Sequence, residues 1–256
     1  MERTFVFSLP FTSLRLKEAV IAVVELVEKG GKHIVVTANV DHILRLQRDN
    51  EFLKAYKQAT YIFADGMPVV LASRILRHPL PERVTGTDLF PAVCKIAADK
   101  NYKIFLLGGL EGVAESAAKK LKTHYPSLNI AGSYSPPFGF EHSEEENKHI
   151  IELINRVSPH ILFIGVGAPK QEKWLYNHLD ELDIRVGICV GAAFDFIAGR
   201  IKRAPKFMQR LSLEWLWRLI HEPRRLWRRY LYDLRFLFLL LRELRKHKTK
   251  RAKCKT

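Results

Sequence analysis

Short apolar runs alternate with longer amphipathic segments along the first 199 residues. The apolar runs are four to six residues long and predict buried strands at 33–37, 61–64, 103–107, 128–131, 161–165 and 185–190. Between them, the helices are expected at 14–28, 40–59, 68–76, 87–99, 111–124, 143–157 and 170–179. Continuous apolar strands separated by helices are typical of a mostly parallel sheet covered on both faces. The sequence therefore predicts a Rossmann-like α/β domain over residues 1–199.

Polar residues or glycines follow nearly every predicted strand. Thr37 and Asn39 end the first strand, Asp65 follows the second, and later strands lead into Gly108 and Gly191. Ligands of parallel α/β sheets bind beyond the carboxyl ends of the strands. The pattern therefore predicts a binding edge on this side of the sheet.

A different pattern begins near Arg200. Helices are expected over 211–220 and from Pro223 onward, since proline is tolerated in the first turn of a helix. The second helix carries an apolar stripe made of Trp227, Leu231, Leu234, Phe238 and Leu241. Arginines at 225, 228, 235 and 242 are spaced by 3 and 7 and share a face. A basic amphipathic helix of this kind is suited to lying in a membrane interface.

The charge of the chain divides at the same place. Of 42 Lys and Arg and 27 Asp and Glu residues, 19 basic and 4 acidic ones lie in 200–256, which therefore holds the whole net charge of +15. We call residues 1–199 the body and residues 200–256 the tail. The tail is predicted to contain a helical, basic, membrane-binding appendage at 200–247 and a disordered basic segment at 248–256. Charge alone leaves nucleic acid, a phospholipid surface and a phosphorylated substrate open as partners.

The sequence favours a membrane surface over nucleic acid as the partner of the tail. The best apolar run of the tail, 236–241, has six residues, whereas a membrane span needs roughly 20, and the N-terminus does not resemble a signal peptide. The tail aromatics lie on the apolar stripe and are not interleaved with basic residues as a base-stacking platform would require. We therefore expect a protein that lies on a membrane, with nucleic-acid binding as the main competing hypothesis.

Several classes of site are disfavoured. The three cysteines, at 94, 189 and 254, are far apart and form no CxxC pair, so neither a disulfide framework nor a metal site is expected. Cys94 and Cys189 are predicted to be core residues. Free cysteines of this kind fit a reducing cytoplasm. No Asp-x-Asp, HExxH or GxSxG motif is present, which argues against metal-dependent and hydrolytic chemistry. The glycines at 108, 109 and 112 could hold a phosphate or only allow close packing, and the missing acidic residue about 20 positions later disfavours NAD.

Two carboxylates remain candidates for chemistry. Asp65 lies between a predicted strand and Gly66, where it could cap the next helix or accept a proton from a hydroxyl group. Asp195 poses the same choice after the last strand. The residues alone leave both alternatives open.

An ordered set of motifs resembles one family. The segments are 37–39 (TAN), 64–68 (ADGMP), 82–88 (ERVTGTD), 165–172 (GVGAPKQE), 191–199 (GAAFDFIAG), 203–205 (RAP) and 214–219 (EWLWRL). Together they resemble the TagA/WecG/CpsF glycosyltransferases, which build cell-surface polymers on a lipid carrier. The resemblance extends from about residue 4 to 240 and includes the tail.

The resemblance implies an activity. It is the transfer of N-acetylmannosamine from UDP to the 4-hydroxyl of N-acetylglucosamine on diphospho-undecaprenol, with inversion to a β linkage, during synthesis of the wall teichoic acid linkage unit. Relatives use N-acetylmannosaminuronic acid or glucose instead. The neutral sugar is expected here because the motifs are more similar to those of the teichoic-acid branch. No cofactor and no metal are expected, because arginines would neutralise the leaving diphosphate.

The resemblance also implies roles for individual residues. Asp65 would be the general base, and tail arginines would complete the site and stabilise the UDP leaving group. The implied catalytic residues are Asp65, Arg218, Arg225 and Arg228. The implied substrate-binding residues are Thr37, Asn39, Arg83, Asp88, Gln171 and Asp195. The segment 135–140 is expected to be a loop near the pocket, with no role assigned.

The lipid-linked acceptor implies a location. We expect a cytoplasmic protein that is peripheral on the inner face of the cell membrane, with homo-oligomers of the body in solution and no nucleic-acid partner. Two hypotheses from other classes remain: a nucleotide-sugar sensor without turnover, and a basic-tailed nucleic-acid binder.

Overall fold

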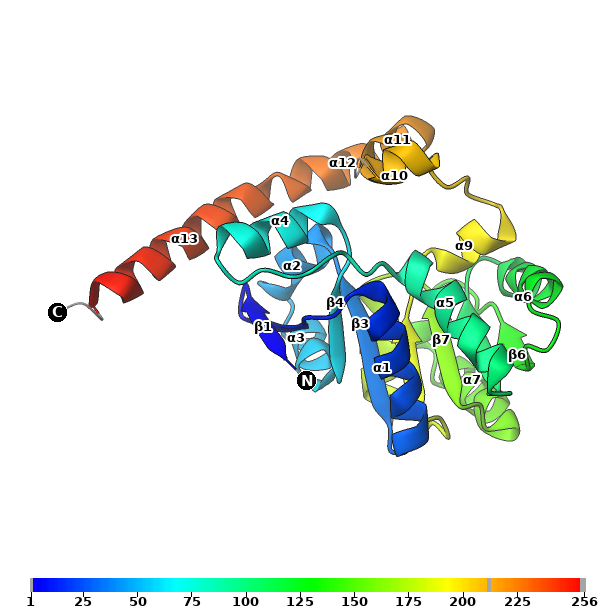
Figure 1. Cartoon of the computed structure of the whole chain (residues 1–256). Coiled ribbons are helices and arrows are strands. Elements are labelled where there is room, and N and C mark those ends of the chain that lie inside the picture. The colour runs from blue at the N-terminus through cyan, green and yellow to red at the C-terminus, as the bar shows by residue number, and fades with distance from the viewer. Residues whose placement is uncertain (1, 211–212, 254–256) are drawn as a thin grey trace.

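A six-stranded parallel sheet forms the centre of the body (Figure 1). The computed structural model describes residues 2–210 and 213–253. The order of the strands is β4-β3-β8-β7-β5-β6. They are β3 (His33–Ala38), β4 (Tyr61–Ala64), β5 (Ile104–Gly108), β6 (Ile130–Tyr134), β7 (Ile161–Gly165) and β8 (Val186–Cys189). The predicted Rossmann-like class is confirmed.

Helices cover both faces of this sheet, and two hydrophobic clusters fill the space between the layers. One cluster joins the sheet to α1 (Leu16–Lys29), α5 (Gly86–Asp99), α6 (Val113–His124) and α9 (Ala193–Ala198). The other joins it to α2 (Val40–Leu46), α3 (Asn50–Gln58), α4 (Met67–Ile75), α7 (Glu144–Val157) and α8 (Lys170–His178). Successive residues of β3 alternate between the clusters, with Val35 in the first and Val36 in the second. Cys94 and Cys189 are buried, as predicted for core residues.

Several predicted elements were wrong in detail. The single helix expected over 40–59 is divided into α2 and α3, because Asp49 accepts a hydrogen bond from the Phe52 amide at 2.9 Å and starts a new helix. The strand expected at 128–131 runs instead from Ile130 to Tyr134, all half-buried, so this edge strand lacks a continuous apolar signal. The 3-10 turn η1 (Phe140–His142) and the short helix α9 were not predicted.

An N-terminal hairpin was also missed. Strands β1 (Arg3–Val6) and β2 (Leu9–Thr12) pair antiparallel. Phe7 and Ser8 form the turn with positive φ angles of 52° and 64°, a conformation for which Asn-Gly or Asp-Gly is the usual sequence signal. The turn therefore carries no signal of a hairpin in its sequence.

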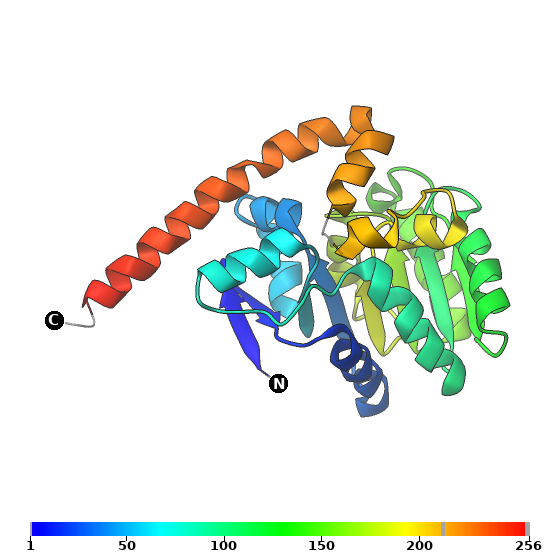
Figure 2. The same ribbon diagram turned by 45° about the horizontal axis from the view of Figure 1, so that its top comes forward.

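The tail lies over the edge of the sheet at which the strands end, and its last helix extends beyond the body (Figures 1 and 2). It consists of α10 (Lys206–Arg210), α11 (Glu214–His221), α12 (Pro223–Asp233) and α13 (Arg235–Lys253). The helix start at Pro223 is confirmed, whereas the predicted start at 211 lies outside the described residues. The predicted disordered segment, 248–256, is helical as far as Lys253, and its last three residues lie outside the described part.

The tail packs on the body through residues that are not part of the predicted apolar stripe. Phe236 is 5% exposed and packs on Phe7 with 5.0 Å between the ring centroids. Leu239, Leu240 and Leu244 pack against the same cluster. The predicted stripe, by contrast, is solvent-exposed, from 47% at Trp227 to 74% at Phe238. Within the described residues, none of the helices combines the length and apolar character needed to traverse a bilayer.

Candidate active site

Asp65 lies at the carboxyl end of β4, on the edge of the sheet that the tail covers. Its amide donates to the Ala38 carbonyl at 2.9 Å, which fixes the residue beside the end of β3. The N-cap of α4 is Gly66, with φ 119°, and no side chain caps that helix. Among the described residues, none donates a hydrogen bond to the Asp65 carboxylate. The helix-cap alternative for Asp65 therefore finds no support in the geometry.

The surroundings of Asp65 strengthen it as a base. Its side chain keeps partial contact with solvent, yet burial in the surrounding protein is the largest cause that raises its pKa to about 6. The carboxylate of Glu214 raises the pKa further, while the guanidinium of Arg83 opposes the shift. A carboxyl group with this pKa is ionised at neutral pH and holds a proton more strongly than an ordinary aspartate, which suits a general base.

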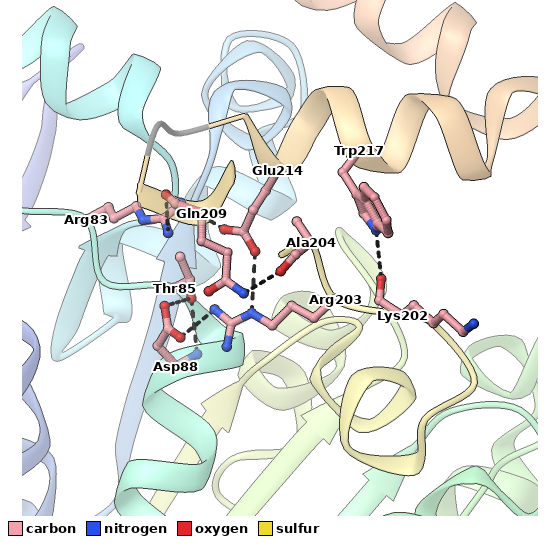
Figure 3. Close-up of polar contacts among 9 residues, drawn as sticks. All are labelled: Arg83, Thr85, Asp88, Lys202, Arg203, Ala204, Gln209, Glu214 and Trp217. Carbon is pink, nitrogen blue, oxygen red and sulfur yellow. Dashed lines mark hydrogen bonds and ion pairs between the residues drawn. The ribbon is translucent and has the colours of Figure 1, made fainter. Parts of the chain in front are cut away.

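A chain of charged groups joins the body to the tail (Figure 3). Arg83 Nη1 donates to Glu214 Oε2 at 2.8 Å, and Arg203 Nε donates to Glu214 Oε1 at 3.4 Å. Arg203 Nη2 also donates to Asp88 Oδ1 at 2.5 Å. The other Asp88 oxygen accepts from the Thr85 hydroxyl at 2.8 Å. The structure thus brings the predicted residues Arg83 and Asp88 together with Asp65.

Arg203 and Glu214 were missed as site residues. Both lie in segments that carry the family resemblance, but their partners Asp88 and Arg83 are 115 and 131 positions away in the chain. Nothing in their local sequence identifies those partners. The motifs RAP and EWLWRL were the only available signal.

Residues at the end of β3 lie on the same edge of the sheet. Thr37 is buried, and its carbonyl accepts from the Tyr56 hydroxyl at 3.2 Å. Asn39 caps α2 by accepting from the His42 amide at 3.2 Å. The same Asn39 oxygen accepts from Arg229 Nη2 at 3.4 Å. A tail arginine that was not predicted therefore reaches a predicted substrate-binding residue.

Gln171 and Asp195 are already engaged in contacts within the body. Gln171 is 2% exposed, and its Oε1 accepts from the amides of Gly167 and Gly191 at 3.3 and 3.2 Å. It thereby ties the loop after β7 to the loop after β8. Asp195 pairs with Arg200 Nε at 2.6 Å. In this structure both side chains hold the loops and helix starts around the site.

The three predicted tail arginines lie in different surroundings. Arg218 stands 5.9 Å above the Phe196 ring, is near enough to lower the pKa of Asp65, and has a buried Nε without a hydrogen-bond partner. Arg228 is exposed and stacks on Trp227 at 5.3 Å. Arg225 lies in α12, and its side chain is outside the described part of the structure. Among the described side chains of the three, Arg218 is the one whose charge acts on Asp65.

The glycine-rich turn after β5 has a packing role. A Cβ on Gly108 would lie 2.6 Å from the Gly165 carbonyl carbon, so the ends of β5 and β7 approach each other closely only with glycine there. The following loop starts at Ser135, whose hydroxyl donates to the Gly108 carbonyl at 3.1 Å. Phe138 in this loop is fully exposed and lies under Lys170. The loop 135–140 therefore begins at the same edge of the sheet, where β5 ends.

Metal ligands are not grouped in the described part of the chain. Across residues 2–210 and 213–253, no three His, Cys, Asp or Glu side chains are arranged to hold a metal ion.

Comparisons with known proteins identify related sequences. The model of the glycosyl transferase WecG/TagA/CpsF family matches residues 4–250. A protein of Bacillus subtilis (strain 168) is 32% identical over 216 residues, which cover 84% of this chain and 82% of that protein. A protein of Staphylococcus aureus (strain MRSA252) is 34% identical over 194 residues, which cover 76% and 74%. Both are named N-acetylglucosaminyldiphosphoundecaprenol N-acetyl-beta-D-mannosaminyltransferase.

Proposed function

The chain belongs to the glycosyl transferase WecG/TagA/CpsF family, and on that premise we propose that it transfers N-acetylmannosamine from UDP to the 4-hydroxyl of N-acetylglucosamine on diphospho-undecaprenol. The names of both relatives support this donor sugar and this acceptor. The observation that carries the proposal is that the tail covers the edge of the sheet where Asp65 ends β4 (Figure 1) and that Arg218 of the tail is near enough to lower the pKa of Asp65. UDP-N-acetylmannosaminuronic acid and UDP-glucose are the alternative donors.

Asp65 acts as the general base in this proposal. Its carboxylate takes the proton of the acceptor 4-hydroxyl while that oxygen attacks the anomeric carbon of the donor sugar. The bond from that carbon to the UDP oxygen breaks, and its electron pair goes to the diphosphate. A single displacement of this kind inverts the anomeric configuration and gives the β linkage.

Arginine side chains stabilise the departing diphosphate. Arg218 has a buried Nε without a hydrogen-bond partner, and a guanidinium can bind phosphate oxygens through two parallel N–H donors. A guanidinium close to the leaving group neutralises the charge that develops on the diphosphate. The proposal is metal-independent because this charge supplies the stabilisation. Arg225 and Arg228 are proposed to join Arg218 when the donor binds.

The tail brings the enzyme to its lipid-linked acceptor. The exposed stripe from Trp227 to Leu241 and the surrounding arginines suit binding to an anionic membrane surface. We place the protein in the cytoplasm, peripheral on the inner face of the membrane, where the acceptor is held. Homo-oligomers of the body in solution belong to the same proposal, as does the absence of a nucleic-acid partner.

One assay tests the proposal. The full chain is incubated with a short-chain lipid-diphosphate-N-acetylglucosamine and, in turn, each of the three UDP-sugars, with and without vesicles that contain anionic lipid. We expect a disaccharide-lipid product, formed fastest with UDP-N-acetylmannosamine and accelerated by vesicles. Binding of UDP-sugar without product would identify a sensor. Retention on DNA or RNA that salt abolishes, without product, would identify a nucleic-acid binder.

A further inference from the structure

Glu214 is the first residue of α11 and joins the tail to the body (Figure 3). Both of its carboxylate oxygens are engaged, one by Arg83 of the body at 2.8 Å and the other by Arg203 of the tail at 3.4 Å. Arg83 extends the connection by donating to the Gln209 carbonyl at 3.3 Å. One arginine of the body therefore holds both α10 and α11.

The contacts of Glu214 also hold it in one geometry. Arg203 reaches Asp88 at 2.5 Å, so the arginine that meets Glu214 is itself anchored at the start of α5. The segment before α10 is tied to the tail helices by Trp217 Nε1, which donates to the Lys202 carbonyl at 3.1 Å. Glu214 is therefore placed by contacts from the body and from the tail. Its position depends on the tail being docked.

The charged and titratable groups that interact electrostatically with Asp65 come from several elements: Arg83, Asp88, Glu214, Arg218 and the Tyr56 phenol. Glu214 and Arg218 belong to the tail, and the others to the body. The two arginines favour the ionised form of Asp65, whereas the two carboxylates favour its protonated form. After burial, Glu214 is the largest cause that raises the pKa of Asp65.

We propose that Glu214 is a positioning residue that couples docking of the tail to the strength of Asp65 as a base. The inference rests on the proposed function, in which Asp65 accepts the proton of the acceptor hydroxyl. When α11 is docked, Glu214 is held on Arg83, whose neighbour Val84 donates its amide to the carbonyl of Ala64, next to Asp65, at 2.8 Å. The Glu214 carboxylate then makes the aspartate a stronger proton acceptor. When the tail is displaced, Asp65 loses this neighbouring charge together with Arg218. The enzyme then has neither its tuned base nor its leaving-group cation.

The test compares pH profiles of kcat/KM for transfer by the full chain. Glu214→Gln keeps the shape of the side chain and removes its charge, so the acid limb of the profile should move to lower pH by about 0.5 to 1 unit. Glu214→Asp keeps the charge and should restore the limb toward its wild-type position. Glu51→Gln is the matched control, because Glu51 also bridges two elements through Lys173 at 2.9 Å, away from Asp65. Its profile should overlay that of the wild type.

A direct titration accompanies the kinetics. The carboxyl ¹³C resonance of Asp65, assigned with Asp65→Asn, reports its protonation in the intact chain and should shift in the same direction in Glu214→Gln. A Glu214→Gln profile lowered at every pH with an unmoved limb, and an unmoved ¹³C titration, would reduce Glu214 to a structural contact. If Asp65→Asn kept wild-type turnover, the proposed base itself would fail. Loss of turnover in Asp65→Asn with unchanged Glu214→Gln titrations would overturn this inference alone.

Discussion

Arg83 and Glu214 are 131 positions apart in the chain and form an ion pair at 2.8 Å. The pair joins the loop that precedes α5 to the first turn of α11. Arg229 of α12 also reaches Asn39 at the end of β3, the strand that pairs with β4. The tail is therefore attached to the body at two places on the edge of the sheet where Asp65 lies.

Arg218 should matter to the reaction more than Arg228. Arg218→Ala removes the cation near Asp65 and should lower kcat about 10²-fold, since a single stabilising group at a developing charge has effects of that order. Arg228→Ala removes a cation that is exposed on Trp227 and should cost less. Steady-state kinetics with a short-chain acceptor, without vesicles, separates these effects from membrane binding. Equal losses in the two variants would show that Arg218 has no special position.

Phe236 and Phe238 form a matched pair on α13. Phe236 is 5% exposed and packs on the body, so Phe236→Ala should lower the free energy of unfolding by about 3 kcal/mol. Phe238 is 74% exposed, so Phe238→Ala should leave the free energy of unfolding nearly unchanged and weaken binding to anionic vesicles. Thermal unfolding and vesicle sedimentation measure the two effects. Undiminished vesicle binding by Phe238→Ala would show that the exposed stripe does not bind the membrane.

Glu172 should make stability depend on pH. It is fully buried, and burial raises the pKa of its carboxyl group to about 7 in the folded chain, above the ordinary value near 4.5. Between these two pH values the folded state binds more protons than the unfolded state. The free energy of unfolding must therefore fall as the pH rises through this window, by up to about 3 kcal/mol.

The variant Glu172→Gln isolates that effect. Its amide can still accept from Gln171 Nε2, as the carboxylate does at 2.8 Å, but it cannot titrate. Between pH 5 and 8 its free energy of unfolding should fall less than that of the wild type. Denaturant unfolding at several pH values measures the difference, with Glu152→Gln on the exposed face of α7 as the control. Parallel curves for wild type and Glu172→Gln would show that Glu172 does not titrate in this window.

The sequence was sufficient for the parts of the fold whose signal is local. Apolar runs such as 161–165 located the central strands, and Pro223 located the start of a tail helix. The signal failed where a single side chain changed the path of the chain. Asp49 divides a continuous amphipathic pattern into α2 and α3, and the turn at Phe7 and Ser8 lacks the residues usual for its backbone conformation.

The sequence suggested several members of the candidate site but not the contacts that join them. Asp65 was found because it follows a strand, and Arg83 and Asp88 because they lie in a family motif. Ion pairs such as that between Arg203 and Asp88 arise only when the folded chain brings distant segments together. Gln171, for which contact with the donor stays a prediction, accepts hydrogen bonds from two backbone amides. Tertiary contacts decide which polar atoms of a side chain remain available to bind a ligand.

The central claim is that Asp65 is the base of a sugar transfer completed by the tail. Its most direct test is the rate of disaccharide-lipid formation from UDP-N-acetylmannosamine and a short-chain lipid-diphosphate-N-acetylglucosamine, measured with wild type and Asp65→Asn at pH 7.5. The account predicts product with the wild type and a rate roughly 10² to 10⁴ lower with a folded Asp65→Asn that still binds UDP. Equal rates for the two proteins, or no product from the wild type with any of the three UDP-sugars, would contradict it.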